Sequence, residues 1–158
     1  MVVKTADEAL RWRRRLESLW NGPIPLVEAM GIEIRSLDAA ALVLVAPLAL
    51  NSNHMGTAFG GSLQAIATLA GWGITVIAAG DERPSHVVIS NARMQFLEPL
   101  SGELVAECFH PEAGALAAFQ TTLRRRGRAR LTVPVLVPGP GGKPAARFVG
   151  EFVALLAS

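Results

Sequence analysis

The chain has few of the residues that build metal centres or disulfides: one cysteine, three histidines and no tyrosine among 158 residues. With Cys108 as the single thiol, an intrachain disulfide and every CxxC-type metal or redox site are excluded. We expect Cys108 to be a small buried hydrophobic residue. The histidines stand apart at 54, 86 and 110, which does not make a metal-ligand set. The sequence therefore predicts no metal ion and no cofactor.

Charge is also sparse, at 18% of residues, whereas 51% are hydrophobic. This balance is typical of a globular domain that buries part of its surface in an oligomer. The formal net charge is only +2, and arginines cluster at 11–15 and 124–130. We therefore expect local contacts with anions and no nucleic-acid binding. Acidic residues near the amino terminus stand where a signal peptide would need an apolar segment, which favours a cytoplasmic location.

Residues 55–80 contain no charged side chain, and this length meets the crude rule for a membrane span. Five glycines fall between positions 60 and 80, and four polar residues, Ser62, Gln64, Thr68 and Thr75, interrupt the apolar run. A helix that is apolar on all sides can instead be surrounded by protein. We therefore expect a buried core helix and no integral membrane association.

Hydrophobic periodicity and turn residues divide the chain into alternating elements. Helices are expected at 5–20, 60–79 and 112–125, and strands at 26–37, 39–48, 86–97, 103–109, 128–137 and 145–156. Pro134 indicates an edge position or a bulge in its strand. An antiparallel sheet that curls around helix 60–79 would explain why this helix carries no charge. The domain organisation that follows is an N-terminal amphipathic helix in residues 1–22 and one α+β domain in residues 23–158.

The loop from Asn51 to Gly61, which runs directly into the uncharged helix, is the most informative segment for function. Gly60 and Gly61 leave the first-turn amides of that helix unshielded. These N–H groups have no partner inside the helix, and the helix dipole favours negative charge there. A polarised carbonyl oxygen can therefore accept a hydrogen bond at this point.

Several strings in the chain resemble a known family. They are Asn53-His-Met-Gly-Thr-Ala-Phe-Gly-Gly-Ser-Leu63, Gly71-Trp-Gly73 and Arg126-Gly-Arg-Ala-Arg-Leu131. Together with the order of elements, they resemble the hotdog-fold thioesterases, and within them the YiiD C-terminal thioesterase-like family, over about residues 23–158. The resemblance implies a sheet wrapped around a long central helix. It also implies a homodimer, with a dimer of dimers as the larger assembly to consider, that acts on thioesters of coenzyme A or acyl-carrier protein. Coenzyme A would enter only as part of the substrate.

The chain departs from the broader hotdog thioesterase pattern Asn-x-x-Gly-x-x-His-Gly-Gly. The pattern is matched by Asn53, Gly56, Gly60 and Gly61. Phe59 stands where the pattern has histidine, and Thr68 stands where the helix would carry an acid. Another arrangement in these enzymes places an aspartate in the loop, where this chain has asparagines. Neither familiar carboxylate is present.

Three residues are the catalytic candidates for thioester hydrolysis. The Gly61 N–H would bind the developing oxyanion. His54 is the histidine of the loop and the leading candidate for the general base, because histidine can exchange a proton near neutral pH. Asn53 would orient water or the carbonyl. The structural alternatives are close packing for the glycines, a loop hydrogen bond for His54 and a turn for Asn53.

Further residues are candidates for binding the substrate. They are Thr57, Phe59, Gly60, Ser62, Thr68, Trp72, Met94 and Arg128. Thr57 and Ser62 could instead cap the helix, and the apolar members could simply belong to the core. Arg128, with its neighbouring arginines, could meet phosphates of coenzyme A or acids of a carrier protein, or lie in a solvated turn.

Because the usual carboxylates are missing, a second function is open: an acyl-thioester-binding or regulatory hotdog domain without hydrolytic activity. A hotdog dehydratase fits less well, because such sites pair a histidine with an acid on the partner helix. Here the corresponding helix is uncharged and has Thr68.

Overall fold

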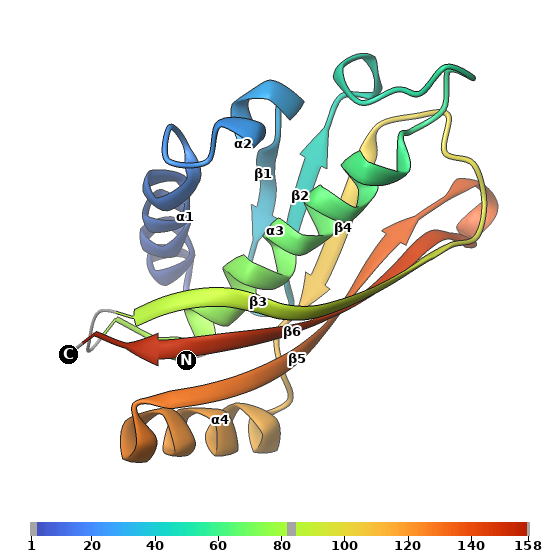
Figure 1. Cartoon of the computed structure of the whole chain (residues 1–158). Coiled ribbons are helices and arrows are strands. Elements are labelled where there is room, and N and C mark those ends of the chain that lie inside the picture. Colours follow the sequence, from blue (N-terminus) through green and yellow to red (C-terminus); the bar gives the residue numbers. More distant parts are fainter. Residues whose placement is uncertain (1–2, 82–84, 158) are drawn as a thin grey trace.

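The computed structural model describes residues 3–81 and 85–157 of the chain (Figure 1). The helices are α1 Ala6–Trp20, α2 Pro25–Met30, α3 Gly60–Ala79 and α4 Ala113–Arg126, with short 3-10 turns at Leu48–Leu50 and Pro140–Gly142. The strands are β1 Glu33–Leu37, β2 Ala41–Ala46, β3 Ser85–Phe96, β4 Leu104–Phe109, β5 Arg128–Pro138 and β6 Pro144–Leu156.

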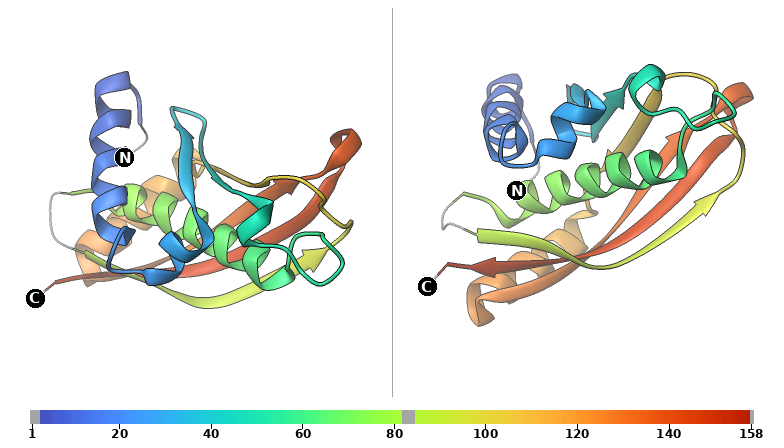
Figure 2. Two further views of the ribbon diagram at one scale, coloured as in Figure 1. Left: turned by 90° about the horizontal axis from the view of Figure 1, so that it is seen from above. Right: turned by 45° about the horizontal axis from the view of Figure 1, so that its top comes forward.

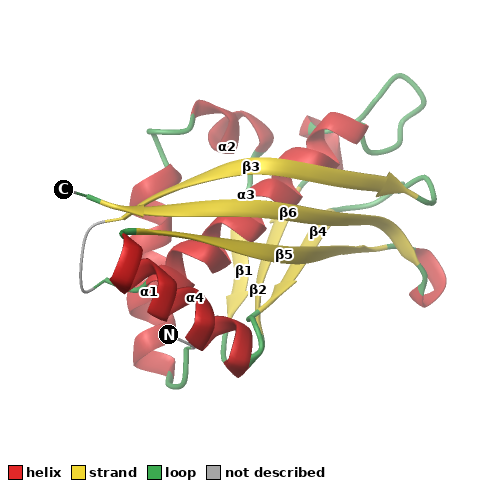
Figure 3. Ribbon diagram, turned by 60° about the horizontal axis from the view of Figure 1, so that its bottom comes forward, coloured by secondary structure: helices red, strands yellow, loops and turns green. Residues whose placement is uncertain are grey.

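The six strands form one antiparallel sheet in the order β1-β2-β4-β5-β6-β3. Between β4 and β5 the ladder contains one residue pair, Glu107 with Leu136. At this point the sheet turns, so that β1, β2 and β4 lie across the direction of β5, β6 and β3 (Figures 1 and 3). The two halves enclose α3 (Figure 2). This is the α+β hotdog architecture that the sequence predicted.

Helix α3 is the centre of the core. Its residues from Leu69 to Ala78 are buried except for Trp72, which is half-buried. The helix is long and apolar enough to cross a membrane, but 67% of its apolar window is buried inside the protein. The sheet therefore provides the apolar surroundings that a charge-free helix requires.

Two strand predictions were wrong. The segment 26–37 does not form one strand: Pro25–Met30 is a helix, and β1 begins only at Glu33. Val27 and Met30 are its buried positions, three residues apart, and Gly31 ends it with φ of 65°. Pro134 lies in β5, an interior strand, so the expected edge position is wrong. The ladder between β4 and β5 is reduced to one pair, which leaves room for a residue without an N–H.

Strand β3 also differs from expectation. Alternation of apolar and polar residues in this segment predicts a buried face with Ala92, Met94 and Phe96, but Ala92 and Phe96 are exposed and Met94 is only half-buried. The strand lies at an edge of the sheet and pairs with β6 alone. Among the described residues, its other hydrogen-bonding edge is therefore unpaired. The charged sequence Asp81-Glu-Arg-Pro84 predicts a turn after α3, but residues 82–84 lie outside the described residues.

Helix α1 packs its buried face against the domain. Thr5 and Glu8 form a capping box at its start, and Trp12, Leu16 and Trp20 are buried in the common core. The Arg13 guanidinium donates to the Ile34 carbonyl of β1 at 2.8 Å. The amphipathic helix predicted at 5–20 is confirmed.

Glycines allow α3 to approach its neighbours closely. A Cβ atom built on Gly71 would lie 2.7 Å from the Phe152 ring, and one on Gly73 would lie 2.8 Å from Leu42. Real Cβ atoms do not come so close, so any larger residue here forces side chains or backbone to move. Phe152 and Leu42 are completely buried, which leaves little room for that movement.

We predict that Gly71→Ala lowers the free energy of unfolding by about 1–3 kcal/mol, because overpacking outweighs the better helix propensity of alanine. The matched control is Gly114→Ala in α4, where a Cβ meets nothing within 4 Å. There we expect a gain of up to about 1 kcal/mol. Urea unfolding of both variants measures the difference, and equal changes would contradict the close approach.

Candidate active site

The loop before α3 is anchored to the body of the protein at both ends. Asn51 is 2% exposed, and its Nδ2 donates to the carbonyls of Met30 and Pro47, each at 2.8 Å. The N–H of Ala58 donates to the Leu100 carbonyl, and that of Phe59 donates to the Asn51 carbonyl, both at 2.8 Å. The position at which α3 starts is therefore fixed by backbone and side-chain bonds together.

Asn53 holds the tip of this loop in a tight turn. Its Oδ1 accepts from the N–H of Met55 at 2.9 Å and from that of Thr57 at 3.2 Å, while Nδ2 donates to the Thr57 hydroxyl at 2.9 Å. Gly56 has φ of 76°, which a glycine adopts without strain. Asn53 and Thr57 thus make the turn-forming contacts that were the structural alternative for Asn53.

The first turn of α3 is open. Phe59 is the N-cap residue, and it makes no side-chain capping bond, so the capping role considered for Thr57 and Ser62 is wrong. Across the described part of the chain, no acceptor faces the N–H groups of Gly60 and Gly61. The first-turn amides of a helix have no internal partner. Gly61 is exposed, so a ligand oxygen can reach its N–H.

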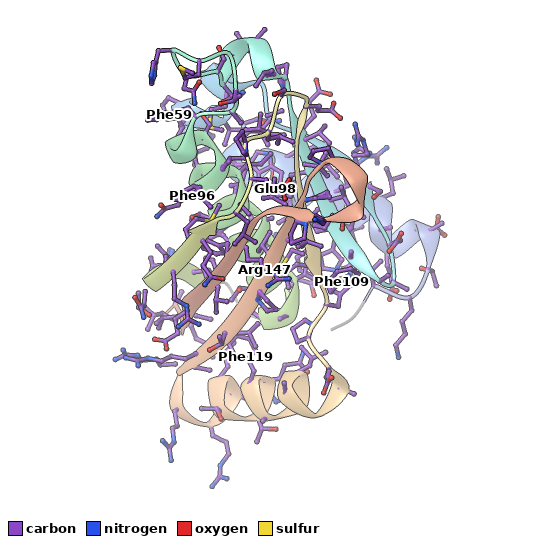
Figure 4. The ribbon with its side chains drawn as sticks, turned by 90° about the vertical axis from the view of Figure 1, so that its right-hand side faces the viewer. Phe59, Phe96, Glu98, Phe109, Phe119 and Arg147 are labelled. Carbon is purple, nitrogen blue, oxygen red and sulfur yellow. The ribbon has the colours of Figure 1, made fainter. Side chains whose placement is uncertain are left out.

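Two phenyl rings cover the glycines that open the helix. A Cβ on Gly61 would lie 2.5 Å from the ring of Phe59, and one on Gly60 would lie 3.3 Å from the ring of Phe96. Both phenylalanines are more than half exposed, and they lie at the same end of the molecule (Figure 4). Phe59, which stands at the histidine position of the related pattern, therefore forms an apolar wall beside the open amide.

A cavity of about 430 Å³ lies alongside α3. Helix α3 contributes Gly61, Gln64, Ala65, Thr68, Leu69 and Trp72 to its lining. The opposite walls are Ile24, Leu26, Val27 and Ile32 around α2, Ile89 of β3 and Phe152 of β6. The open amide and an apolar cavity are thus continuous, a size and character typical of small-molecule sites.

Among the residues that the structure describes, the lining of this cavity contains no ionisable side chain. Its polar side chains are Gln64 and Thr68, which lie on the same helix face as Gly61. Gln64 is exposed, and sequence reasoning did not select it as a site residue. Its spacing of three residues from Gly61 and four from Thr68 is the signal that could have identified it, because such residues share one face of a helix.

The structure brings some of the predicted site residues together and separates others. Gly61, Thr68 and Trp72 line the cavity, and Phe59 lies against Gly61. His54 is exposed at the loop tip and is not part of the lining. Ser62 and Met94 are half-buried and also lie outside the lining.

Arg128 is far from the open amide of its own chain. Phe96, which packs on Gly60, pairs with Ala146 of β6, whereas Arg128 pairs with Leu155. These two β6 positions are nine residues apart, which corresponds to roughly 30 Å along a strand. Arg128 is exposed, and its neighbour Arg130 lies 3.7 Å from the Glu151 carboxylate.

Two other titratable side chains, Cys108 and His110, are held within the fold and lie outside the cavity lining. Cys108 is completely buried, as predicted, and burial raises the pKa of its thiol. Burial also lowers the pKa of His110, whose Nε2 lies 2.9 Å from the Asp38 carbonyl oxygen. Within residues 3–81 and 85–157, no group of three or more His, Cys, Asp or Glu side chains could hold a metal ion.

Comparison with known proteins gives a family and several structural relatives. Residues 13–156 match the family described as "Putative thioesterase (yiiD_Cterm)". A Chlorobaculum tepidum protein of unknown function is 30% identical, with a TM-score of 0.89 and coverage of 97% of this chain and 98% of its own. A structure described as a "putative thioesterase" from Shewanella oneidensis is 28% identical, with a TM-score of 0.80 and coverage of 92% and 98%. A Pseudomonas aeruginosa protein described as a "Probable Thioesterase" shares the fold at 20% identity, with a TM-score of 0.78 and coverage of 99% and 100%.

Proposed function

The chain belongs to the YiiD C-terminal thioesterase family, and from this we propose that it hydrolyses acyl thioesters of coenzyme A or of an acyl-carrier protein at the start of α3. One observation carries the proposal. Gly61 both presents an open first-turn amide and lines the apolar cavity. A thioester carbonyl on this N–H would have its acyl chain in the cavity and its sulfur directed outward.

In this reaction a water oxygen attacks the thioester carbonyl carbon and the carbonyl oxygen becomes an oxyanion. The C–S bond then breaks, and the proton taken from the water passes to the departing sulfur, which leaves as the thiol. The Gly61 N–H and the positive end of the α3 dipole stabilise the oxyanion. Phe59 beside the amide excludes solvent from one side and strengthens that interaction. The carboxylic acid leaves through the cavity mouth.

We assign proton removal from water to His54 and the positioning of its loop to Asn53. The side chain of Asn53 makes three bonds within the turn, so it holds the backbone on both sides of His54. Thr57 completes that turn. His54 is exposed and outside the lining of the cavity, so this assignment requires that it act on a water at the cavity mouth.

We also propose that the protein is a homodimer formed through the edge of β3. This strand has 12 residues and pairs only with β6, yet Val88, Ile89 and Phe96 are exposed on it. A long edge with exposed apolar side chains favours pairing with a second copy. In a two-fold antiparallel pair, the end of β3 beside Gly60 faces the beginning of the partner strand. Coenzyme A phosphates at one site could then meet Arg128 of the second subunit.

The described part of the cavity lining has no ionisable side chain, which favours a second candidate function. A domain that binds acyl thioesters without hydrolysing them needs the open amide and the apolar cavity, but no base. The two functions differ in one measurable property, release of free thiol, and the following variants are chosen to decide between them.

Two substitutions of Gly61 separate the loss of its N–H from the steric effect of an added side chain. Alanine and proline both add a Cβ that displaces the Phe59 ring, but only proline removes the N–H, and proline is tolerated in a first helical turn. We expect thiol release from an acyl-CoA panel to be about 10²–10³-fold slower in Gly61→Pro than in Gly61→Ala. Equal rates in the two variants would show that this N–H is not the oxyanion donor.

His54→Ala tests the proposed base. We expect kcat to fall by about 10²–10⁴-fold, because general-base catalysis contributes that much. The melting temperature should not change, since the side chain is exposed. Ser52→Ala, an exposed position in the same loop, is the control with normal kcat. Unchanged turnover in His54→Ala would exclude a base role.

Val88→Lys tests the dimer. Val88 is 51% exposed on β3, and a lysine there would place charge in the proposed interface. We expect light scattering to give a dimer for the wild type and a monomer for Val88→Lys. Leu10→Lys changes a residue that is 47% exposed on α1, and it should remain dimeric. A monomeric wild type would refute pairing through β3.

A further inference from the structure

We infer that the cavity beside α3 accepts an uncharged, apolar acyl chain and that Trp72 sets the limit on its length. This inference rests on the proposed function, because it takes the Gly61 N–H as the point that holds the thioester carbonyl. It concerns the substrate class, which neither the fold nor the family determines. Three features of the cavity support it: its direction, its charge and its end wall.

The direction follows from the residues that α3 contributes. Among the α3 residues that line the cavity, Gly61 stands at one end and Trp72 at the other, eleven residues further along the helix. With a rise of 1.5 Å per residue, the two are roughly 16 Å apart along the axis. A chain whose carbonyl lies at Gly61 therefore extends past Ala65 and Leu69 towards Trp72.

The charge of the lining defines the chemical class. The lining formed by residues 3–81 and 85–157 has no ionisable side chain, and its walls are mainly aliphatic or aromatic. A carboxylate or ammonium group at the far end of an acyl chain would be buried without a partner, which is strongly unfavourable. Acyl groups that end in a charge are therefore rejected, whereas each additional methylene of a plain chain gains by burial until the cavity is full.

The end wall is held in place by two contacts. The indole Nε1 of Trp72 donates to the Val87 carbonyl of β3 at 2.8 Å. On its other side, the ring of Trp20 lies 6.3 Å from the Trp72 ring, centroid to centroid, at 49°. Trp20 belongs to α1 and is 1% exposed, so it cannot move aside easily. Trp72 is thus a rigid wall at the end of the cavity, with α1 behind it.

The experiment measures kcat/KM for hydrolysis of straight-chain acyl-CoA substrates of increasing length by the intact protein. For the wild type, kcat/KM should rise about fourfold per methylene, the factor that corresponds to 0.8 kcal/mol, and then fall beyond a limiting length. Trp72→Ala should move this limit to longer chains. Ala65→Phe fills the middle of the cavity and should move the limiting length to shorter chains. This second variant keeps the test valid if Trp72→Ala does not fold.

The readout is the ratio of kcat/KM for long and short chains, so a general loss of activity does not affect it. A limit that stays at the same length in both variants would overturn the inference. An octanoyl thioester and the same chain ending in a carboxylate provide the test of charge, and we expect at least a 100-fold preference for the neutral chain. Equal values would also overturn the inference.

Calorimetric binding of the same acyl-CoA series separates failure of the inference from failure of the proposed function. If no thiol is released but affinity rises with length to a limit that the two variants shift, the hydrolytic function fails and the inference stands. If thiol is released without any shift in the limit, the hydrolytic function stands and the inference fails.

Discussion

The enclosure of α3 by the sheet is the constraint on which the rest of the structure depends. A helix of 20 residues without a charged side chain must be covered on nearly every side. The sheet achieves this by turning between β4 and β5, and Gly71 lets the helix approach Phe152 of β6. Once the helix is fixed this closely, the position of its first turn is fixed as well. The position of Gly61 is therefore determined by the packing of the core.

The same enclosure is incomplete at one side, and the cavity lies there. Around α2 and at β3 the walls are formed by few residues, and Leu26 and Ile89 remain exposed. The uncovered side lies next to β3, one of the two edge strands of the sheet. In the proposed dimer, a second copy at β3 would add apolar surface next to the cavity, so dimer formation and substrate binding would draw on the same region.

The sequence was sufficient for the central features of the fold. A charge-free segment that opens with Gly60-Gly61 predicts both the buried helix and the open amide, because each depends on local chemistry. It was insufficient where short elements or distant segments decide the outcome. The six residues of α2 are too few for their helical spacing to be distinguished from strand alternation. The cavity joins Ile24, Ile89 and Phe152, and only the tertiary fold brings these positions together.

One residue, Asn51, joins the wall of the cavity to the start of α3. Its side chain donates to the Met30 carbonyl at the end of α2, and its backbone carbonyl accepts from the N–H of the N-cap residue of α3. Because α2 forms a wall of the cavity, an outward movement of α2 would have to break this buried bond or pull the start of α3 with it. If the proposed function is correct, admission of the acyl chain and alignment of the thioester carbonyl would therefore be coupled.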